Sequence, residues 1–210
     1  MFTPVFPSKI KDIAGAYLRL LDKWNGVHSL TALPSAMRFE ALLLDSSALL
    51  PHLEILSAGS FVTDFGSGMG VPAVVIAAHR PDICVAAIDR NHKKAAFVRQ
   101  VALELKLDNL RSICGSVESI TPLEAHFGTA KAVGPLNLLL DWWDRHSIHG
   151  APFFAFKGPG WSLSEIKKGW DYEIHPYQLP NLGERVIVKL VNNQLEQFNC
   201  VKSQSISGVD

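Results

Sequence analysis

Val62-Thr63-Asp64-Phe65-Gly66-Ser67-Gly68-Met69-Gly70 is the stretch that decides the fold, because it puts an acidic residue and three glycines where a short apolar run gives way to a helical one. Glycine suits such a turn, since it adopts positive φ angles without strain and lets the backbone come close to a ligand. The stretch therefore predicts a strand, a nucleotide-cradling loop and a helix. A tight turn that binds nothing is the plainer alternative, and the loop alone does not exclude it.

The spacing of the glycines distinguishes between classes of ligand. A dinucleotide fingerprint reads G-x-G-x-x-G, whereas here Gly66, Gly68 and Gly70 are evenly spaced and Val71 stands where the fingerprint needs glycine. This disfavours an NAD-linked oxidoreductase. The pattern from Asp64 onward, D-x-G-x-G-x-G, resembles the first motif of S-adenosylmethionine-dependent methyltransferases. Asp64, Gly66, Gly68 and Gly70 are therefore candidate cofactor-binding positions, and so is Val71 after them.

Composition and charge bound the class of protein. With 210 residues and 48% hydrophobic composition, the chain can bury one substantial core. Lys plus Arg and Asp plus Glu are equal at 20 each, so the molecule as a whole does not attract nucleic acid. Any polyanion site must come from a local patch.

Three cysteines, an odd number, lack C-x-x-C spacing, and we expect them to be reduced, buried and structural. No basic segment followed by a long apolar run opens the sequence, and nowhere do eighteen apolar residues follow one another. The expectation is a soluble, cytoplasmic protein with no membrane partner. The three cysteines are Cys84, Cys114 and Cys200.

The first fifty-odd residues have helical periodicity. A stripe of apolar residues predicts an amphipathic helix that ends near Asn25-Gly26, and a second helix is expected over residues 36–50, before Pro51. Residues 1–55 thus predict a helical N-terminal extension that forms one structural unit with a Rossmann-like domain over residues 56–210. The stripe consists of Ile10, Ile13, Ala14, Tyr17, Leu21 and Trp24.

Beyond the extension, strand-like runs alternate with helical ones, which is typical of an α/β protein with a mostly parallel, doubly wound sheet. Two β-rich runs near the C-terminus, joined by a turn-forming set at 180–183, predict an antiparallel hairpin. The last ten or so residues are polar, and we expect them to fray. The expected parallel strands are 61–65, 84–89, 111–115, a weak fourth run at 129–133, and 152–156; the hairpin strands are 172–179 and 185–191.

Ligands in an open α/β sheet bind at the carboxyl ends of the strands, so polar residues there are candidate site residues. Asp89 ends the second expected strand, where a carboxylate accepts hydrogen bonds from both ribose hydroxyls of an adenosine cofactor. Capping of the following helix is the alternative, and the two roles are compatible. Val117-Glu118 follows the third strand, where a backbone amide and an apolar wall meet an adenine ring.

The order of several blocks resembles the bacterial small-subunit ribosomal RNA guanine N7 methyltransferase family, also called glucose-inhibited division protein B. The most specific part of the resemblance is a Lys-Trp-Asn block in the helical lead-in that precedes this glycine loop. The matching blocks, from about Tyr17 to Leu190, are Leu21–Asn25, Leu30-Thr31, Leu44–Ser46, Asp64–Pro72, Phe97–Val101, Glu104–Asn109, Val117-Glu118, Phe156–Gly158 and Glu184-Arg185.

The resemblance implies a Rossmann-like enzyme that uses S-adenosylmethionine to methylate N7 of one guanine in 16S ribosomal RNA, with the small ribosomal subunit as partner. Carried over by position, cofactor contacts fall on Gly66, Val71, Val117 and Glu118. The chain departs from the family where Ser116 replaces an expected arginine and where Ala130-Lys131-Ala132 replaces Ser-Arg-Ala. Lys131 keeps the charge for a contact to the methionine carboxylate or to phosphate, without the planar fork of arginine.

Guanine N7 has an exposed lone pair, so alignment with the methyl group supplies most of the acceleration and no acid–base residue is required. Lys157, at the end of a strand, and Arg185, which opens the last one, are the candidates for substrate positioning, and an ordinary surface cation is the alternative for each. Trp142 and Trp143 are stacking candidates, although their spacing favours packing of a helix on the sheet. His146 and His149 lack a third ligand nearby, so no metal is expected.

Three alternatives stay open: a degenerate RNA- or ribosome-binding protein that has lost methyl transfer, a methyltransferase with another acceptor, and a cofactor that is bound but not used. We expect the protein to be a monomer.

Overall fold

The computed structural model describes residues 1–192, so Cys200 and the expected fraying of the last residues lie outside the described part. Its centre is a seven-stranded sheet in the order β3-β2-β1-β4-β5-β7-β6, in which β1 to β5 are parallel and β7 is antiparallel to both neighbours. This confirms the predicted fold class and the hairpin. The strands are β1 Phe61–Phe65, β2 Cys84–Asp89, β3 Leu110–Cys114, β4 Phe127–Lys131, β5 Phe153–Lys157, β6 Trp170–Leu179 and β7 Gly183–Asn192.

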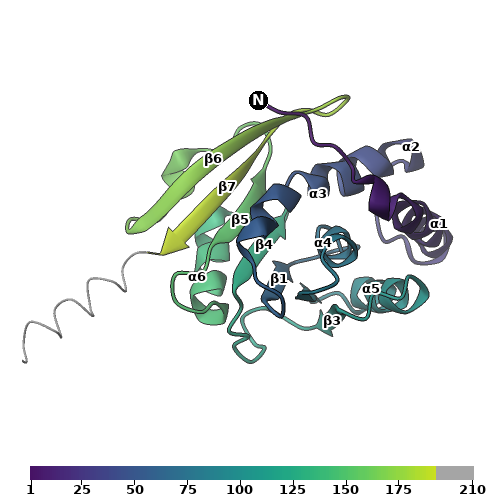
Figure 1. Cartoon of the computed structure of the whole chain (residues 1–210), viewed down its shortest axis with the longest axis horizontal. Coiled ribbons are helices and arrows are strands. Elements are labelled where there is room, and N and C mark those ends of the chain that lie inside the picture. The colour runs from purple at the N-terminus through teal and green to yellow at the C-terminus, as the bar shows by residue number, and fades with distance from the viewer. Residues whose placement is uncertain (193–210) are drawn as a thin grey trace, which may run out of the picture.

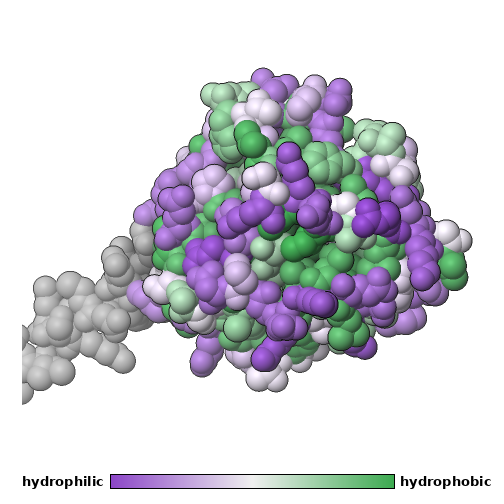
Figure 2. All heavy atoms as spheres, turned by 45° about the vertical axis from the view of Figure 1, so that its right-hand side comes forward, coloured by the Kyte–Doolittle hydropathy of each residue, from purple (hydrophilic) through white to green (hydrophobic). Residues whose placement is uncertain are grey.

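Helices cover both faces of the sheet, as a doubly wound fold requires. Figure 1 shows α4 (Ala73–His79) and α5 (His92–Glu104) on one side of the strands and α6 (Leu136–His146) on the other. Each side has its own hydrophobic core, one shared with the N-terminal helices and one built around Trp143 of α6. Figure 2 shows one face of the molecule, where hydrophilic residues surround a more hydrophobic centre.

The N-terminal extension is helical, as predicted, but its boundaries differ. The first helix, α1 (Lys11–His28), continues through Gly26, because Asn25 O accepts the Ser29 N–H and Trp24 packs against His28 in the last turn. It ends at Ser29, whose φ of 51° is left-handed. The other elements of the extension are η1 Ser8–Ile10, α2 Ser35–Arg38, the π-helical turn η2 Phe39–Leu44, α3 Asp45–Ser47 and η3 Leu50–Ile55.

The expected second helix over residues 36–50 is therefore not one regular helix. Ser46 Oγ donates to Leu42 O and Ser47 Oγ donates to Leu44 O at 2.7 Å, so hydroxyl groups compete for carbonyls of the helical ladder. Pro51 then starts a 3-10 turn. Sequence periodicity predicts one helix over residues 36–50, but the structure divides this segment into short α, π and 3-10 pieces.

The hairpin and the N-terminus lie side by side (Figure 1), since Phe2 forms a parallel bridge with Tyr177 and Gln178 N donates to Phe2 O at 2.8 Å. Beneath them, Tyr177 Oη donates to Asp45 Oδ1 at 2.5 Å, and Asp45 Oδ2 pairs with Lys131 Nζ at 3.1 Å. The extension, the end of β4 and the hairpin therefore meet at one buried carboxylate.

The prediction of buried cysteines is wrong for Cys84 and Cys114, which are both exposed. Cys84 begins β2 and Cys114 ends β3, the edge strand, and strand ends leave the layer that the helices cover. Within residues 1–192, no helix combines the length and the apolar character needed to cross a bilayer.

Candidate cofactor and acceptor site

A pocket of about 470 Å³ lies at the carboxyl ends of β1, β2 and β3, where a ligand is expected in an open α/β sheet. Of the predicted site residues, Gly66, Asp89, Val117 and Glu118 line it together. The remaining lining residues are Ile88, Arg90, Asn91, Lys94, Gly115, Ser116, Val133, Leu138 and Trp142.

The three loop glycines are needed for different reasons, although all have positive φ angles of 57° to 84°. A Cβ on Gly66 would lie 2.7 Å from both methyl groups of Val133, and a Cβ on Gly70 would lie 2.8 Å from Val98 of α5. A Cβ on Gly68 would meet nothing closer than 4.0 Å. Gly66 thus fixes the wall of the pocket, and Gly70 fixes the approach of α5.

Asp64 is fully buried behind the loop and does not line the pocket. Its Oδ2 accepts the Ala73 N–H at 3.2 Å, which ties the end of β1 to the start of α4, while Oδ1 has no hydrogen-bond partner among the described residues. Burial raises the pKa of Asp64 to about 8, opposed by the Ala73 N–H and the charge of Lys131. Val71 is likewise buried beneath the loop.

Asp89 connects the loop to the pocket. Its Oδ2 accepts the Gly68 N–H at 2.8 Å and its Oδ1 accepts the Asn91 N–H at 2.8 Å, which leaves one lone pair on each oxygen for a ligand. The cap of α5 is Asn91, whose side chain accepts from Lys93 N and Lys94 N. The capping alternative for Asp89 is therefore wrong, and its carboxylate holds the loop at the pocket rim.

Val117 and Glu118 form the opposite wall. Ser116 Oγ donates to Glu118, and this hydrogen bond lowers the pKa of that carboxyl. His146, buried on α6, forms a 2.8 Å hydrogen bond with Val117 O and so holds this wall to the helix. Within the described chain, no cluster of three metal-ligating side chains is present.

The two tryptophans of α6, Trp142 and Trp143, have different surroundings. Trp143 is 1% exposed and donates through Nε1 to Ala151 O at 3.0 Å, which confirms that one of the pair packs the helix on the sheet. Trp142 lines the pocket beside Leu138 and Val133. The apolar wall of the pocket therefore includes an indole that the sequence pattern did not separate from its neighbour.

Lys131, an expected cofactor contact, does not line the pocket. Its ammonium group donates to Ala41 O at 2.6 Å and pairs with Asp45 at 3.1 Å. A buried ammonium group needs a counter-charge, and the one it finds belongs to the helical extension. Lys131 is thus part of the junction beneath the hairpin.

The extension also reaches the loop itself, which sequence reasoning missed. Tyr17 of α1 is fully buried and donates through Oη to Met69 O at 3.0 Å. Its ring and that of Trp24 both make edge contacts with Phe97 of α5, at centroid distances of 5.9 Å and 5.6 Å. The only signal in the sequence was the position of Tyr17 on the apolar stripe.

The predicted substrate-positioning residues lie on the same edge of the sheet. Lys157 ends β5, and its Nζ reaches Gly134 O at 3.4 Å, in the connection that supplies Val133 to the pocket. Arg185 lies on β7, one residue from Val186, which pairs with Lys157. Arg185 does not line the first pocket; it lines a second one beyond the end of β5.

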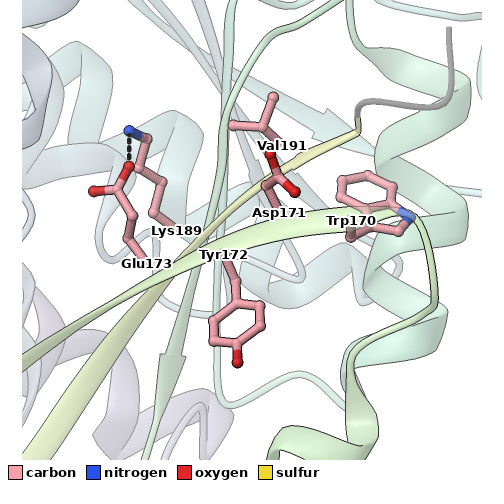
Figure 3. A pocket seen from close by; sticks show the side chains of 6 residues that line it. All are labelled: Trp170, Asp171, Tyr172, Glu173, Lys189 and Val191. Atoms are coloured by element: carbon pink, nitrogen blue, oxygen red, sulfur yellow. Dashed lines mark hydrogen bonds and ion pairs between the residues drawn. The ribbon is translucent and has the colours of Figure 1, made fainter. Parts of the chain in front are cut away.

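A further hollow of about 380 Å³ lies on the hairpin at the end away from Arg185, where β6 begins and β7 ends (Figure 3). In it, Glu173 pairs with Lys189 at 2.6 Å, and Tyr172 points to the side of β6 opposite Asp171. It has neither the glycine loop nor a strand carboxyl end of the parallel sheet, so it is no candidate for the cofactor site.

Comparison with known proteins agrees with this geometry. The family model described as rRNA small subunit methyltransferase G matches residues 10–176. Proteins named ribosomal RNA small subunit methyltransferase G are similar to the chain: one from Methylobacillus flagellatus is 46% identical over 59% of this chain and 58% of its own. One from Neisseria gonorrhoeae is 39% identical over 68% of each chain, and one from Chromobacterium violaceum is 37% identical over 83% and 85%.

Solved structures with a similar fold are more distant in sequence. A SAM-dependent methyltransferase from Aquifex aeolicus is 15% identical, with a TM-score of 0.54 over 74% of this chain and 93% of its own. A precorrin-6y methyltransferase from Geobacter metallireducens is also 15% identical, with a TM-score of 0.53 over 69% and 86%. At this identity the likeness shows the fold alone.

Proposed function

The chain belongs to the rRNA small subunit methyltransferase G family, and from this premise we propose that it transfers a methyl group from S-adenosylmethionine to N7 of a guanine in 16S ribosomal RNA. The observation that carries the proposal is the pocket that brings Gly66, Asp89, Val117 and Glu118 together at the carboxyl ends of neighbouring strands. The chain spans 58% of the length of the Methylobacillus relative, so its activity and substrate are proposals that rest on the site as well.

The residues of the pocket suit an adenosine cofactor without a phosphate. Asp89 retains a free lone pair on each oxygen for ribose hydroxyls, and the glycine at position 66 keeps the loop close to the ligand. Val117 and Trp142 supply apolar surface for a purine ring. A 470 Å³ volume is within the range of small-molecule sites.

When bound, S-adenosylmethionine supplies a methyl group on a positively charged sulfur, and that sulfur keeps the electron pair of the bond that breaks as the methyl group joins N7. The lone pair of N7 is the nucleophile, so the protein supplies position rather than a base. Asp89 and the glycine loop hold one partner. Lys157, whose Nζ contacts Gly134 O in the connection between β4 and α6, holds the other through phosphate.

A second candidate is an RNA-binding protein of the same fold that has lost methyl transfer. Ser116 stands where the family resemblance expects arginine, and Lys131 is engaged by Asp45 and Ala41. The first departure removes a cation beside the pocket, and the second leaves one that is engaged by the helical extension. In this alternative the pocket has no catalytic use.

The experiment that decides is calorimetric titration with S-adenosylhomocysteine, with NAD as control ligand, followed by transfer of labelled methyl groups to unmodified small ribosomal subunits. Micromolar binding of S-adenosylhomocysteine alone, with one methyl group incorporated per subunit at a guanine N7, is the expected result. Binding to the subunit without incorporation would favour the second candidate. No binding of S-adenosylhomocysteine would remove the cofactor proposal.

Its place in the cell follows from the substrate, because small ribosomal subunits are cytoplasmic. We propose that the protein acts there as a monomer, with residues 1–55 and the Rossmann-like domain working as one unit. The contacts of Tyr17 with Met69 and of Asp45 with Lys131 and Tyr177 support the single unit, since each joins the extension to the domain.

A further inference from the structure

A second pocket, of about 350 Å³, opens beside the end of β5. The loop at 158–161 forms one wall and brings Trp161 to it, while the hairpin forms the other with Arg185. The remaining lining residues are Met1, Ile174, Pro176, Glu184 and Val186. No role in the cofactor site accounts for these residues.

This pocket shares the edge of the sheet on which the acceptor base must lie. Lys157 precedes the 158–161 loop and pairs with Val186 of β7, while its ammonium group reaches Gly134 O at 3.4 Å. Val133, directly before Gly134, and Leu138, four residues after it on α6, both line the cofactor pocket. Lys157 therefore stands between the two pockets, and a strand of RNA that crosses it meets both.

The chemistry of the second pocket suits a nucleobase. Trp161 is partly buried and packs against the core around Trp143, so its indole is held in place. Arg185 supplies a planar guanidinium group, and Ile174, 42% exposed, supplies apolar surface on the hairpin. Indole and guanidinium planes are the surfaces on which unpaired RNA bases stack, and arginine also binds phosphate.

The spacing of the sheet separates this base from the acceptor. Neighbouring strands lie about 4.8 Å apart, so β4, which leads into Val133 of the cofactor pocket, and β7, which carries Arg185, are separated by roughly 10 Å. One base cannot occupy both pockets at this separation. The occupant of the second pocket is a different nucleotide.

We infer that this pocket binds an unpaired nucleobase next to the methylated guanine, stacked on Trp161 with its phosphate on Arg185. The inference rests on the proposed function and deepens it, because it names a residue that selects the RNA context of the target. Trp161 is then a positioning residue for the substrate, with no contact to the cofactor.

The test compares Trp161→Ala with wild type in methyl transfer to unmodified small subunits. Loss of one base–aromatic stack is expected to raise KM for the subunit by roughly 5- to 150-fold. The value of kcat and the affinity for S-adenosylhomocysteine should stay within twofold, and Trp161→Phe should recover most of the KM effect. Tyr172→Ala is the matched control, since Tyr172 is an exposed aromatic at the other end of the same hairpin.

An unchanged KM in Trp161→Ala, or an equal rise in Tyr172→Ala, would overturn the inference. Direct binding to the small subunit, measured by filter retention, separates it from the proposed function. If wild type transfers no methyl group and Trp161→Ala still binds the subunit at least fivefold more weakly than Tyr172→Ala, the nucleobase pocket stands and the methyltransferase proposal fails. Equal subunit binding by all variants would overturn the pocket whatever the activity.

Discussion

Substitution of Gly66 by alanine tests the construction of the cofactor loop, and Gly68 provides the matched control. Both residues have similar φ angles, +61° and +57°, so alanine at either position costs roughly 1–2 kcal/mol of backbone strain. At Gly66 the new Cβ also lies 2.7 Å from Val133, and overpacking of this kind costs roughly 1–3 kcal/mol. At Gly68 the nearest atom is 4.0 Å away.

We therefore expect Gly66→Ala to be about 2–5 kcal/mol less stable than wild type in urea denaturation, and Gly68→Ala about 1–2 kcal/mol less stable. Because Gly66 and Val133 both line the cofactor pocket, only the first variant should also bind S-adenosylhomocysteine at least tenfold more weakly by calorimetry. Two variants with equal unfolding free energies and equal affinities would refute this account of the loop.

Three further predictions concern single side chains. Asp89→Ala should weaken S-adenosylhomocysteine binding by roughly 1.5–3 kcal/mol in calorimetry, the range for charge-assisted hydrogen bonds, and unchanged affinity would remove Asp89 from the site. The pKa of Asp64 is raised to about 8 in the fold, so its contribution to stability is full below about pH 4 and is lost as the pH rises to about 8. Asp64→Asn should remove this pH dependence of the unfolding free energy, measured by urea denaturation at pH 5 and pH 8.5. The same pH dependence in wild type and variant would contradict the burial of a neutral acid. Lys157→Ala should reduce methyl transfer to small subunits while leaving S-adenosylhomocysteine affinity unchanged, and a lost affinity would instead assign Lys157 to the cofactor.

The parts of the fold that could be predicted from sequence are those set by local pattern. The glycine loop follows from the special φ angles that it needs, and β1 and β2 were placed to the residue because each is a short apolar run ended by a turn. The prediction started β4 two residues too late, because Gly128 weakens the strand pattern in the sequence. Gly128 is required because a Cβ there would lie 2.5 Å from Trp143, a contact made only in the folded sheet.

In the site too, local pattern predicts some positions and long-range contacts decide the others. Gly66, Asp89, Val117 and Glu118 line one pocket because each lies at the carboxyl end of a parallel strand or within four residues after it, where topology decides position. Lys131 also ends a strand, yet its partners Asp45 and Ala41 belong to the extension. No local sequence pattern predicts this long-range contact. No sequence pattern singles out Trp161, because its proposed role depends on Arg185 and Ile174, which the hairpin brings to the same pocket.

The buried carboxylate of Asp45 also has a consequence for the order in which the chain can mature during its synthesis. One of its partners, Tyr177, follows it by 132 residues, and Phe2 at the other end of the chain bridges that same tyrosine. A nascent chain that has emerged only as far as the glycine loop therefore carries Asp45 and the segment around Phe2 without the partners that they have in the fold. Since folding of such distant contacts waits for the last segment, the cofactor-binding half stays incomplete until the hairpin has left the ribosome's exit tunnel. Premature termination before β6 should thus yield a chain that chaperones and proteases recognise as unfinished, rather than a smaller binding domain.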